Sequence, residues 1–283
     1  MADKWLAELP SEFSSLIGLC LTTPPPITEH LARTHDGRSR YSIGACMEAL
    51  IFAAGKGERM RPLTNHTPKP LLAVGGKRLI EWHIEKLAAC GIHDIVINTS
   101  WLAECFEPAL GDGSRWNVKL HYSYEGPEPL ETGGGMLQAL NFIGDEIFIA
   151  VNGDIWSDVD YAALPTEIFG LAHLLLVDNP AHNLKGDFVL CDDGKVQSDG
   201  PNKLTFSGIG IYQAALFHDW RKIIGDVKGA DETPSRFKLA PLLRHAMYHH
   251  QISGEHHAGH WTDVGTPERL KHLDESLQGF NPA

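Results

Sequence analysis

The sequence predicts an α/β fold in which a mixed, mostly parallel β-sheet is flanked by helices. Two observations carry this prediction. From residue 47 onward, short apolar runs alternate with segments of helical spacing, an alternation typical of βαβ units. The first apolar run, residues 49–54, ends abruptly in Gly55-Lys56-Gly57, as a buried strand does when its carboxyl end leads into a ligand-binding loop. We therefore expect the functional site beyond the carboxyl ends of the strands.

The first half of this region is expected to supply four strands and three helices. An apolar run marks each strand, and apolar residues three or four positions apart mark each helix. The strands are expected at 48–53, 94–98, 118–122 and 146–151, and the helices at 79–90, 101–110 and around 136–140. Gly91 and Gly111 end the first two helices, because glycine readily adopts the backbone conformation that closes a helix.

The second half is less regular and is expected to extend the sheet in mixed orientation. The strands are expected at 172–177, 187–190 and 204–212, and the helices at 239–247 and 266–277. Thr266 is the expected N-cap of the last helix, with Pro267 at its first position. These later elements are expected to build a wall of the binding site.

Residues 1–46 differ from the rest, and we expect an N-terminal extension that is not part of the folded core at 47–283. Residues 5–21 have the spacing of a short amphipathic helix, which the prolines at 24–26 end. Met47 directly precedes the first strand. The extension is therefore either an appendage to the core or the product of an upstream start assignment.

Composition excludes several kinds of partner. The formal net charge is −12, with 36 acidic against 24 basic residues. Nucleic acids and acidic membranes bind broad basic surfaces, so this balance argues against both. No run of about 18 apolar residues predicts a membrane span. The cysteines are odd in number and lack Cys-x-x-Cys spacing, which is typical of reduced thiols, so we expect a cytoplasmic protein.

The glycine-rich loop at 55–64 is unusually basic for so acidic a chain. Gly55 and Gly57 let the backbone turn sharply and bring its N–H groups close to an anion. The cations around the loop are Lys56, Arg59, Arg61 and Lys69. A Walker loop ends in Gly-Lys-Ser/Thr, but here Glu58 follows Gly57, and a dinucleotide fingerprint would need glycine in place of Met60. The pattern favours a ligand with several phosphates, bound in neither of these two common ways.

Two carboxylates follow apolar runs later in the chain. Asp154 comes after Val151-Asn152-Gly153, and Asp263 lies in Trp261-Thr262-Asp263-Val264-Gly265-Thr266. Magnesium in proteins often takes one or two carboxylates together with substrate phosphates. Both residues are therefore candidate metal ligands. The alternative is that each acid caps the helix that follows it.

Taken together, these stretches resemble the sugar-1-phosphate nucleotidyltransferases. The resemblance rests on Gly55-x-Gly57-x-Arg59-Met60-x-Pro62-Leu63-Thr64, Pro68-Lys69-Pro70, Asn152-Gly153-Asp154 and Trp261-x-Asp263-Val264-Gly265-Thr266, which occur in that order. It spans residues 47–275 and implies a nucleotidyltransferase domain over 47–283 with a Rossmann-like (GT-A-like) fold. Within the family, Glu58 and Glu131-Thr132-Gly133-Gly134-Gly135 most resemble the uridylyltransferases that act on N-acetylmuramate α-1-phosphate in peptidoglycan recycling.

The resemblance implies uridylyl transfer from UTP to N-acetylmuramate 1-phosphate with Mg²⁺ as cofactor. It assigns catalysis to Arg59, Lys69 and Asp154, metal binding to Asp154 and Asp263, and sugar binding to Asn152, Asp187 and Glu131. It assigns nucleotide binding to Ala53, Ala54, Gly55, Gly57, Glu58, Arg59, Lys69 and Gly133. The expected partners are small molecules, a nucleoside triphosphate and a sugar 1-phosphate, bound by a monomer or a small homo-oligomer.

The remaining site assignments leave alternatives open. Residues 131–135 are expected to form a second glycine loop before a helix, lining the base or sugar, although a plain helix entry fits the same pattern. Glu125 is a candidate acceptor for N3–H of uracil. Asp187 follows Gly186 at a strand start, so it serves either the sugar or the turn.

The histidines at 249, 250, 256, 257 and 260 match no compact zinc pattern. If 251–258 is a strand, His256 and His257 face opposite sides, which argues against a shared metal. Two other functions remain open. The first is transfer to a hexose 1-phosphate from UTP, dTTP or GTP, and the second is a nucleotide-sugar-binding regulatory protein without catalysis.

Overall fold

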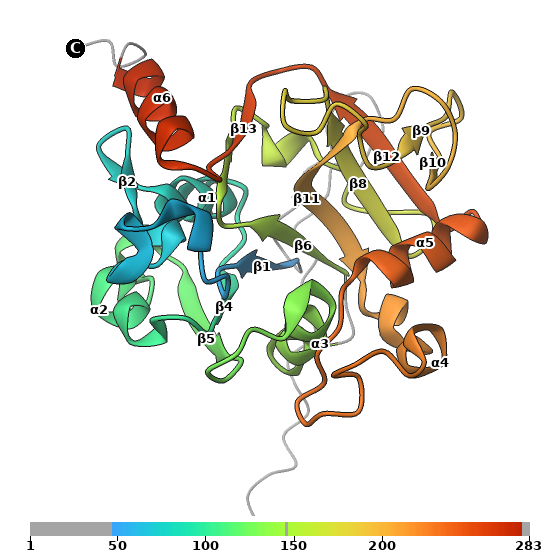
Figure 1. The fold of residues 1–283 in the computed structure, drawn as a ribbon, viewed down its shortest axis with the longest axis horizontal. Helices are drawn as coiled ribbons and strands as arrows, with labels where there is room; N and C mark the ends of the chain where they lie inside the picture. Colours follow the sequence, from blue (N-terminus) through green and yellow to red (C-terminus); the bar gives the residue numbers. More distant parts are fainter. Residues whose placement is uncertain (1–46, 145–146, 279–283) are drawn as a thin grey trace, which may run out of the picture. The chain divides into compact units, whose positions relative to one another are not determined.

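The computed structural model describes residues 47–144 and 147–278. The expected N-terminal extension at 1–46, with its amphipathic segment, lies outside the described residues. The described chain is built around a seven-stranded sheet with strand order β12-β8-β11-β6-β1-β4-β5 (Figure 1). The strands are β1 (Glu48–Phe52), β4 (Asp94–Thr99), β5 (Lys119–Tyr124), β6 (Ile147–Asn152), β8 (Ala172–Val177), β11 (Thr205–Gln213) and β12 (Ile252–His257).

All strands of the sheet but β11 run in the same direction. β1 pairs in parallel with β4 and β6, β4 with β5, and β8 with β12, whereas β11 is antiparallel to both of its neighbours. The predicted mixed, mostly parallel sheet is therefore confirmed. The strand order also reverses at β1, because the chain adds β4 and β5 on one side and returns to add β6 on the other. This reversal opens a crevice at the carboxyl ends of β1 and β6.

Helices cover both faces of the sheet, and each face buries its own apolar cluster. On one face, α1 (Leu79–Ala89) and α2 (Phe106–Leu110) pack over Ala49 and Ile51 of β1. On the other face, α3 (Glu131–Ile143) and α5 (Ala240–Tyr248) pack over Leu50. The alternating side chains of a single buried strand thus serve both layers, which explains why 49–54 is apolar without interruption. The second face also carries α4 (Trp220–Ile224).

A smaller apolar cluster packs the terminal helix against the segment that leads into α1. Val74 and Leu79 pack there against Val264, Leu273 and Leu277. The elements involved are the hairpin β2 (Ala73–Val74) and β3 (Lys77–Arg78), the ribbon β7 (Ile155–Ser157) and β13 (Trp261–Asp263), and α6 (Pro267–Gln278). Thr266 accepts a bond from the amide of Arg269 at 3.4 Å, which confirms the predicted N-cap of α6.

Several short elements were not predicted from the sequence. They are η2 (Glu58–Met60), η3 (Leu63–Asn65), η4 (Lys69–Leu71), η5 (Ala103–Cys105), η6 (Ser114–Trp116), η7 (Tyr161–Ala163), η8 (Ala214–Phe217) and β10 (Val196–Gln197). The strand expected at 187–190 is present as β9 (Val189–Leu190), but it pairs with β10 in a separate two-stranded sheet and does not extend the main one. Within the described ranges, no helix is long and apolar enough to cross a membrane.

Two expectations about secondary structure are wrong. The helix expected at 101–110 is only α2 from Phe106, because Pro108 lacks an N–H and its ring would clash with the preceding turn in a longer helix. Leu102, with φ 53°, redirects the chain before it. The glycine loop expected at 131–135 is instead the beginning of α3, which starts at Glu131.

Candidate active site

The site lies where the carboxyl ends of β1 and β6 meet. The amide of Gly153 donates to the carbonyl of Phe52 at 2.9 Å, so the two strand ends are tied together. A Cβ on Gly153 would lie 2.7 Å from that same carbonyl, which is why glycine is needed at this position. The turn then delivers Asp154 beside the glycine-rich loop that follows β1. Asp154 precedes the strand β7 rather than a helix, so the helix-capping alternative for Asp154 is wrong.

The glycine-rich loop is held by its own residues and leaves its first amides available. Gly57 adopts φ 61°, and its carbonyl accepts from the Thr64 hydroxyl at 2.8 Å. A Cβ on Gly57 would lie 2.9 Å from the methyl group of Thr64. Among the described residues, the amides of 54–57 have no hydrogen-bond acceptor. Exposed amides in a turn of this kind can bind an anion.

A buried polar relay connects the loop to the strands beside it. The amide of Ala53 donates to Oδ1 of Asn98 at 2.6 Å, and Nδ2 of Asn98 donates to Oε1 of Glu125 at 2.5 Å. The other carboxylate oxygen of Glu125 accepts from the amide of Leu130 at 2.7 Å. Asn98 and Glu125 are almost completely buried. Burial raises the pKa of the Glu125 carboxyl from 4.5 to about 7, and the bonds from Leu130 and Asn98 oppose this shift.

The three glycines of α3 make room for protein groups. A Cβ on Gly133 would lie 2.6 Å from the ring of Phe237, and one on Gly134 would overlap the carbonyl of Ser235. One on Gly135 would overlap Oε1 of Glu125. The glycines therefore let the segment before α5 and the Glu125 carboxylate approach the helix, which explains a glycine run inside a helix.

Lys69 reaches across to the β6 end. Its Nζ lies 2.5 Å from Oδ2 of Asp154, and its side chain is only 11% exposed. Lys69 is on η4, immediately after Pro68, so a rigid turn directs it. The cation from the first motif and the carboxylate from the second are thus in direct contact. The structure brings these two residues together as the sequence implied.

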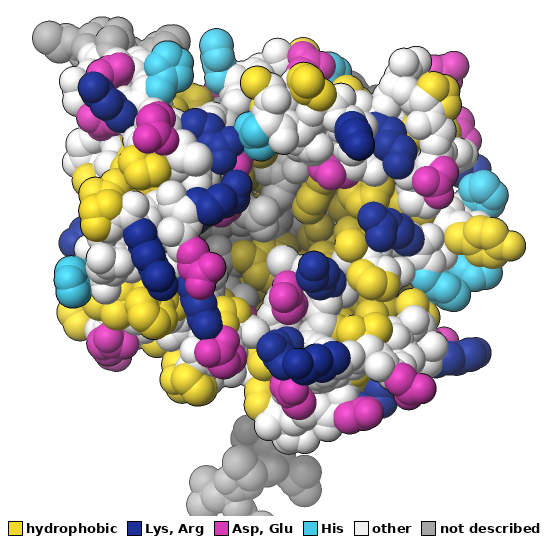
Figure 2. All heavy atoms as spheres, in the orientation of Figure 1, with side chains coloured by type: hydrophobic (Ala, Val, Ile, Leu, Met, Phe, Trp, Pro, Cys, Tyr) yellow, Lys and Arg dark blue, Asp and Glu magenta, His cyan; other side chains and the backbone are white. Residues whose placement is uncertain are grey.

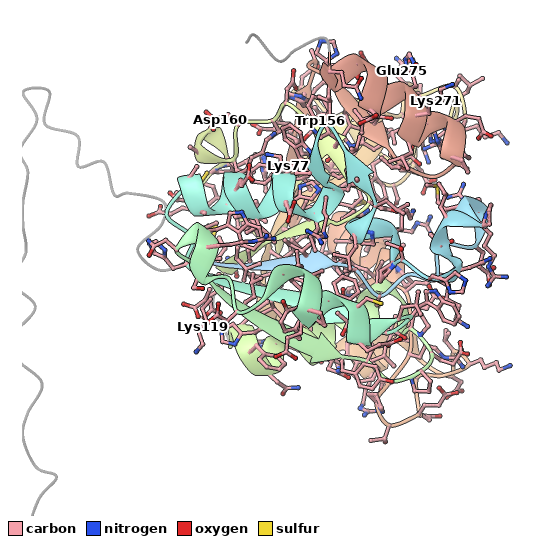
Figure 3. The ribbon with its side chains drawn as sticks, turned by 90° about the vertical axis from the view of Figure 1, so that its left-hand side faces the viewer. Lys77, Lys119, Trp156, Asp160, Lys271 and Glu275 are labelled. Atoms are coloured by element: carbon pink, nitrogen blue, oxygen red, sulfur yellow. The ribbon has the colours of Figure 1, made fainter. Side chains whose placement is uncertain are left out.

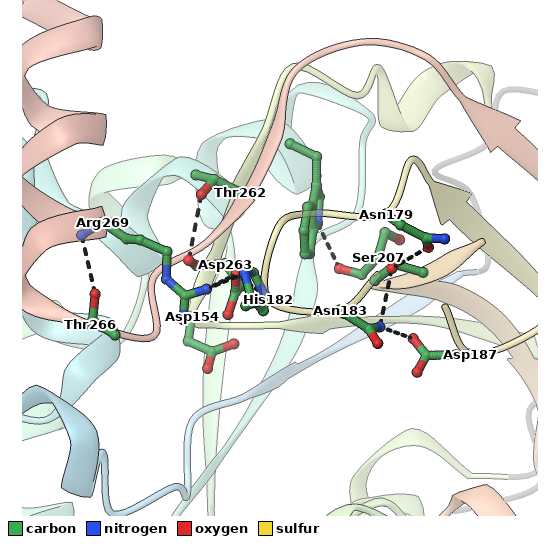
Figure 4. Close-up of polar contacts among 12 residues, drawn as sticks. Asp154, Asn179, His182, Asn183, Asp187, Ser207, Thr262, Asp263, Thr266 and Arg269 are labelled. Atoms are coloured by element: carbon green, nitrogen blue, oxygen red, sulfur yellow. Dashed lines mark hydrogen bonds and ion pairs between the residues drawn. The ribbon is translucent and has the colours of Figure 1, made fainter. Parts of the chain in front are cut away.

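Asp263 lies at the end of β13, next to Asp154 in the β7–β13 ribbon. Asp263 pairs with Ile155 across the ribbon, and the amide of Val264 donates to the carbonyl of Asp154 at 2.8 Å. Two side chains lie close to the Asp263 carboxylate, as Figure 4 shows: Nη1 of Arg269 and Nε2 of His182 are each 3.0 Å from its Oδ1. Nη1 of Arg269 also lies 2.6 Å from Nδ1 of His182.

The two aspartates suit a hard divalent cation by their chemistry. Asp154 lines the cavity described below and Asp263 adjoins it across the ribbon, and magnesium commonly takes one or two carboxylates with the remaining ligands from water and phosphate. No group of three or more metal-ligating side chains occurs among the described residues. The donor set therefore fits a cation that a phosphate ligand helps to hold, and it does not fit a closed protein cage such as structural zinc.

Two adjoining cavities make up the site. A cavity of about 350 Å³ is lined by the loop, Asn98, Glu125, Asn152 and Asp154. The neighbouring cavity of about 580 Å³ is bordered by cations, namely Lys56, Arg59, Lys69 and Arg236. Gly57, Lys69 and Glu131 line both. Figure 2 shows a hollow in this face with Lys and Arg side chains along its rim, in the region of the β1 and β6 ends.

The residues expected to bind the sugar lie at different depths. Asn152 ends β6 and lines the first cavity, and a Cβ on Gly208 would lie 2.7 Å from its side-chain carbon. Asp187 is exposed, and its carboxylate accepts from the amide of Phe206 at 2.9 Å and from Asn183 at 3.3 Å. Asp187 thus fastens its own loop in this structure. Arg59 and Glu58 are exposed beside the second cavity.

Four neighbours of the site were missed at the sequence level: Asn98, His182, Arg236 and Arg269. Asn98 had a signal, since a polar residue near the carboxyl end of a buried strand beside β1 points at the same crevice. Arg269 also had one, because it stands three residues after the N-cap of α6 and so on the turn nearest Asp263. His182 and Arg236 belong to irregular segments, where no period indicates their direction.

The expected histidine pattern is partly tested. β12 meets the condition set for 251–258, because it is a strand, and its two histidines contact separate carboxylates. Nε2 of His256 lies 3.0 Å from Asp178, and Nε2 of His257 lies 2.7 Å from Asp158.

Comparison with known proteins fixes the class. A family model described as nucleotidyl transferase matches residues 48–168. A known relative is 48% identical over 234 residues, which is 80% of this chain and 96% of the relative. With the crevice, the basic loop and the two carboxylates in place, the chain belongs to the nucleotidyl transferase family and is a sugar-1-phosphate nucleotidyltransferase.

That relative is the N-acetylmuramate alpha-1-phosphate uridylyltransferase of Neisseria meningitidis serogroup B. The enzyme of the same description from Caulobacter vibrioides is 29% identical over 78% of this chain and 92% of its own. Among solved structures, a Bacillus anthracis protein assigned as a glucose-1-phosphate thymidylyltransferase, in complex with sucrose, matches with a TM-score of 0.69. It is 21% identical and covers 84% of this chain and 97% of its own, so it supports the fold alone.

Proposed function

We propose that the protein transfers a uridylyl group from UTP to N-acetylmuramate α-1-phosphate, giving UDP-N-acetylmuramate and pyrophosphate. The observation that carries this proposal is the 48% identity to the Neisseria enzyme over nearly its whole length. The reaction would return N-acetylmuramate to nucleotide-linked form during peptidoglycan recycling. Absence of a spanning helix in the described residues and the anionic small-molecule substrates suit a cytoplasmic enzyme.

The chemistry is an in-line displacement. A phosphate oxygen of the sugar 1-phosphate attacks the α-phosphorus of UTP, the bond from that phosphorus to the bridging α–β oxygen breaks, and pyrophosphate leaves with the electron pair. The attacking oxygen is already anionic, so no general base is needed. Lys69 and Arg59 stabilise negative charge on the α-phosphate and on the leaving pyrophosphate. The contact of Lys69 with Asp154 supports this role, because it fixes the ammonium group at the crevice.

We assign the divalent cofactor, Mg²⁺, to Asp154 and Asp263. The ion would neutralise phosphate charge in the transition state. The open edge beside the two carboxylates supports the assignment, since phosphate oxygens can complete the coordination there.

The nucleotide assignment uses the first cavity and the free amides. The loop from Ala53 through Gly57, with Glu58, lines the phosphate path, and Gly133 lies in the α3 turn behind it. Glu125 is already engaged by Asn98 and Leu130, so we assign it to support the wall on which the base rests. Asn152, Glu131 and Asp187 are assigned to the sugar 1-phosphate. The core, residues 47–283, is proposed to act as a monomer or small homo-oligomer, with 1–46 as an extension.

The test is product formation. The full chain incubated with UTP, N-acetylmuramate α-1-phosphate and Mg²⁺ should release pyrophosphate and yield UDP-N-acetylmuramate by mass spectrometry. Asp154→Asn should lose turnover by orders of magnitude and retain part of its UTP binding. The matched control is Asp158→Asn, an exposed aspartate that directly follows β7 and pairs with His257. Nucleotide-sugar binding without turnover in the unaltered chain would instead favour a regulatory protein.

A further inference from the structure

Both carboxylates assigned to the metal are already paired with a cation from this chain. Lys69 holds Asp154, and Arg269 of α6 holds Asp263. Arg269 and Asp263 each have 22% exposed side chains, so solvent screens this pair only in part. The two charges of the carboxylates are thus offset by two charges of the protein. A divalent ion that enters alone would meet these cations at short range.

The chain makes space for Arg269 at this point. A Cβ on Gly265 would overlap Nη2 of Arg269 and lie 3.0 Å from Oδ2 of Asp263. Gly265 does not have a positive φ, so its backbone conformation does not require glycine. Alanine at position 265 would therefore have to displace the end of the Arg269 side chain from Asp263.

His182 fixes the arrangement from the opposite side. Its Nε2 lies 3.0 Å from Oδ1 of Asp263, and its Nδ1 accepts from Nη1 of Arg269. The ring, the guanidinium and the carboxylate form a closed set of contacts, which Figure 4 displays between α6 and the loop after β8. Contacts with Asp263 and His182 consequently hold the Arg269 guanidinium beside the carboxylate assigned to the metal.

We propose that Arg269 is a counterion for Asp263 in the nucleotide-free protein, so that the site takes its divalent cation together with the anionic nucleotide and not alone. This inference rests on the metal assignment in the proposed function. When the triphosphate arrives, its negative charges replace the carboxylates as partners for Arg269 and Lys69. Asp263 and Asp154 are then released toward the ion. Arg269 is a binding residue in this scheme and transfers nothing.

The experiment measures Mn²⁺ binding to the full chain by electron paramagnetic resonance, first without nucleotide. Arg269→Gln removes the charge and keeps a polar side chain of moderate length. We expect the dissociation constant of Mn²⁺ to fall by about threefold to tenfold, because a nearby like charge is removed. Lys271→Gln is the matched control. Lys271 lies on the same helix beside Glu275, 3.8 Å away, and Figure 3 shows the two together on α6. It should leave Mn²⁺ affinity unchanged.

A second arm adds a non-hydrolysable UTP analogue. Arg269→Gln should now weaken binding of the Mn²⁺–nucleotide complex, since the guanidinium has lost its phosphate partner. Opposite signs in the two arms identify a counterion. A purely structural role in holding Asp263 would weaken both. Gly265→Ala, which displaces Arg269 without removing it, should shift Mn²⁺ affinity in the same direction as Arg269→Gln.

The proposal is overturned if Mn²⁺ alone binds Arg269→Gln no more tightly than it binds the unaltered chain, including the case where neither binds. This outcome is separable from failure of the proposed function. If the chain makes UDP-N-acetylmuramate but Mn²⁺ affinity does not respond, only the counterion inference fails. If Mn²⁺ affinity responds and no uridylyl transfer occurs, only the proposed substrates fail.

Discussion

The ammonium group of Lys69 lies 2.5 Å from Oδ2 of Asp154, although the two residues are 85 positions apart in the chain. One side of this contact comes from the rigid turn after the glycine-rich loop, and the other from the end of β6. The contact exists because the strand order reverses at β1 and brings the β1 and β6 ends together. It joins the proposed phosphate and metal halves of the site.

Lys69→Gln should reduce turnover by about a hundredfold or more, because a preorganised charge on the transferring phosphate is lost. Folding stability should change little, since the remaining carboxylate of Asp154 is 36% exposed and can be solvated. Pyrophosphate release under saturating UTP measures the effect. Lys271→Gln is the control, because Lys271 is an exposed lysine that pairs with Glu275 on α6. Equal losses in the two variants would contradict the assignment of Lys69.

Glu125 should make stability depend on pH. Its pKa is about 7 in the folded chain against an ordinary value of 4.5, so the folded state binds this proton more tightly. Stability from this group is therefore lost as pH rises from 4.5 through 7, and it is unaffected below 4.5, where both states are protonated. The free energy of unfolding of Glu125→Gln, measured relative to that of the unaltered chain, should therefore rise by about 2 kcal/mol from pH 5 to pH 8.

Urea unfolding of the unaltered chain and of Glu125→Gln, each at pH 5 and at pH 8, measures how the difference in their stability changes with pH. The control is Glu104→Gln, which removes an exposed carboxyl on η5 and should show no such change. A Glu125→Gln difference that is the same at pH 5 and pH 8 would show that the carboxyl is not held neutral.

Gly134→Ala and Gly55→Ala should separate packing from binding. Alanine at 134 would overlap the carbonyl of Ser235, so we expect a loss of about 2 kcal/mol in the free energy of unfolding, despite the better helix propensity of alanine. Nothing lies within 4 Å of a Cβ on Gly55, and its φ is not positive. Gly55→Ala should therefore keep its stability and raise the KM for UTP. Denaturation of each variant tests the predicted stabilities, and steady-state kinetics test the predicted change in KM. Equal stability of the two variants would contradict the packing argument.

Deletion of residues 1–46 should leave thermal stability and turnover unchanged, because the described sheet begins at Glu48 and its two apolar clusters begin at Met47 and Leu50. Differential scanning calorimetry and the pyrophosphate assay on the shortened chain measure this. An insoluble or inactive product would refute the proposed role of 1–46 as an extension.

The sequence predicted the sheet well because its strands are buried on both faces and leave uninterrupted apolar runs, as in β1 and β6. It predicted α3 poorly at its start, since Gly133, Gly134 and Gly135 together resemble a loop. Their reason is the approach of Phe237 and Ser235, about a hundred residues later, which no local pattern records. The helix expected from 101 is absent for a local reason, the proline at 108, which disfavours a helix extending before Phe106.

The residues of the candidate site likewise fall into those that a local sequence motif indicates and those that only long-range contacts reveal. Gly57, Lys69, Asp154 and Asp263 belong to short motifs with a chemical meaning, and the structure places them around one crevice. Arg269 and His182 act through long-range contacts with Asp263, so their part emerges only once α6 and the loop after β8 are placed.

The most direct test of the central claim is a matrix of kcat/KM values for pyrophosphate release. It crosses UTP, dTTP, GTP and CTP with N-acetylmuramate, glucose and mannose 1-phosphates on the full chain. The account predicts the highest value for UTP with N-acetylmuramate 1-phosphate, and loss of that activity in Asp154→Asn. Release with glucose 1-phosphate but none with N-acetylmuramate 1-phosphate would contradict it.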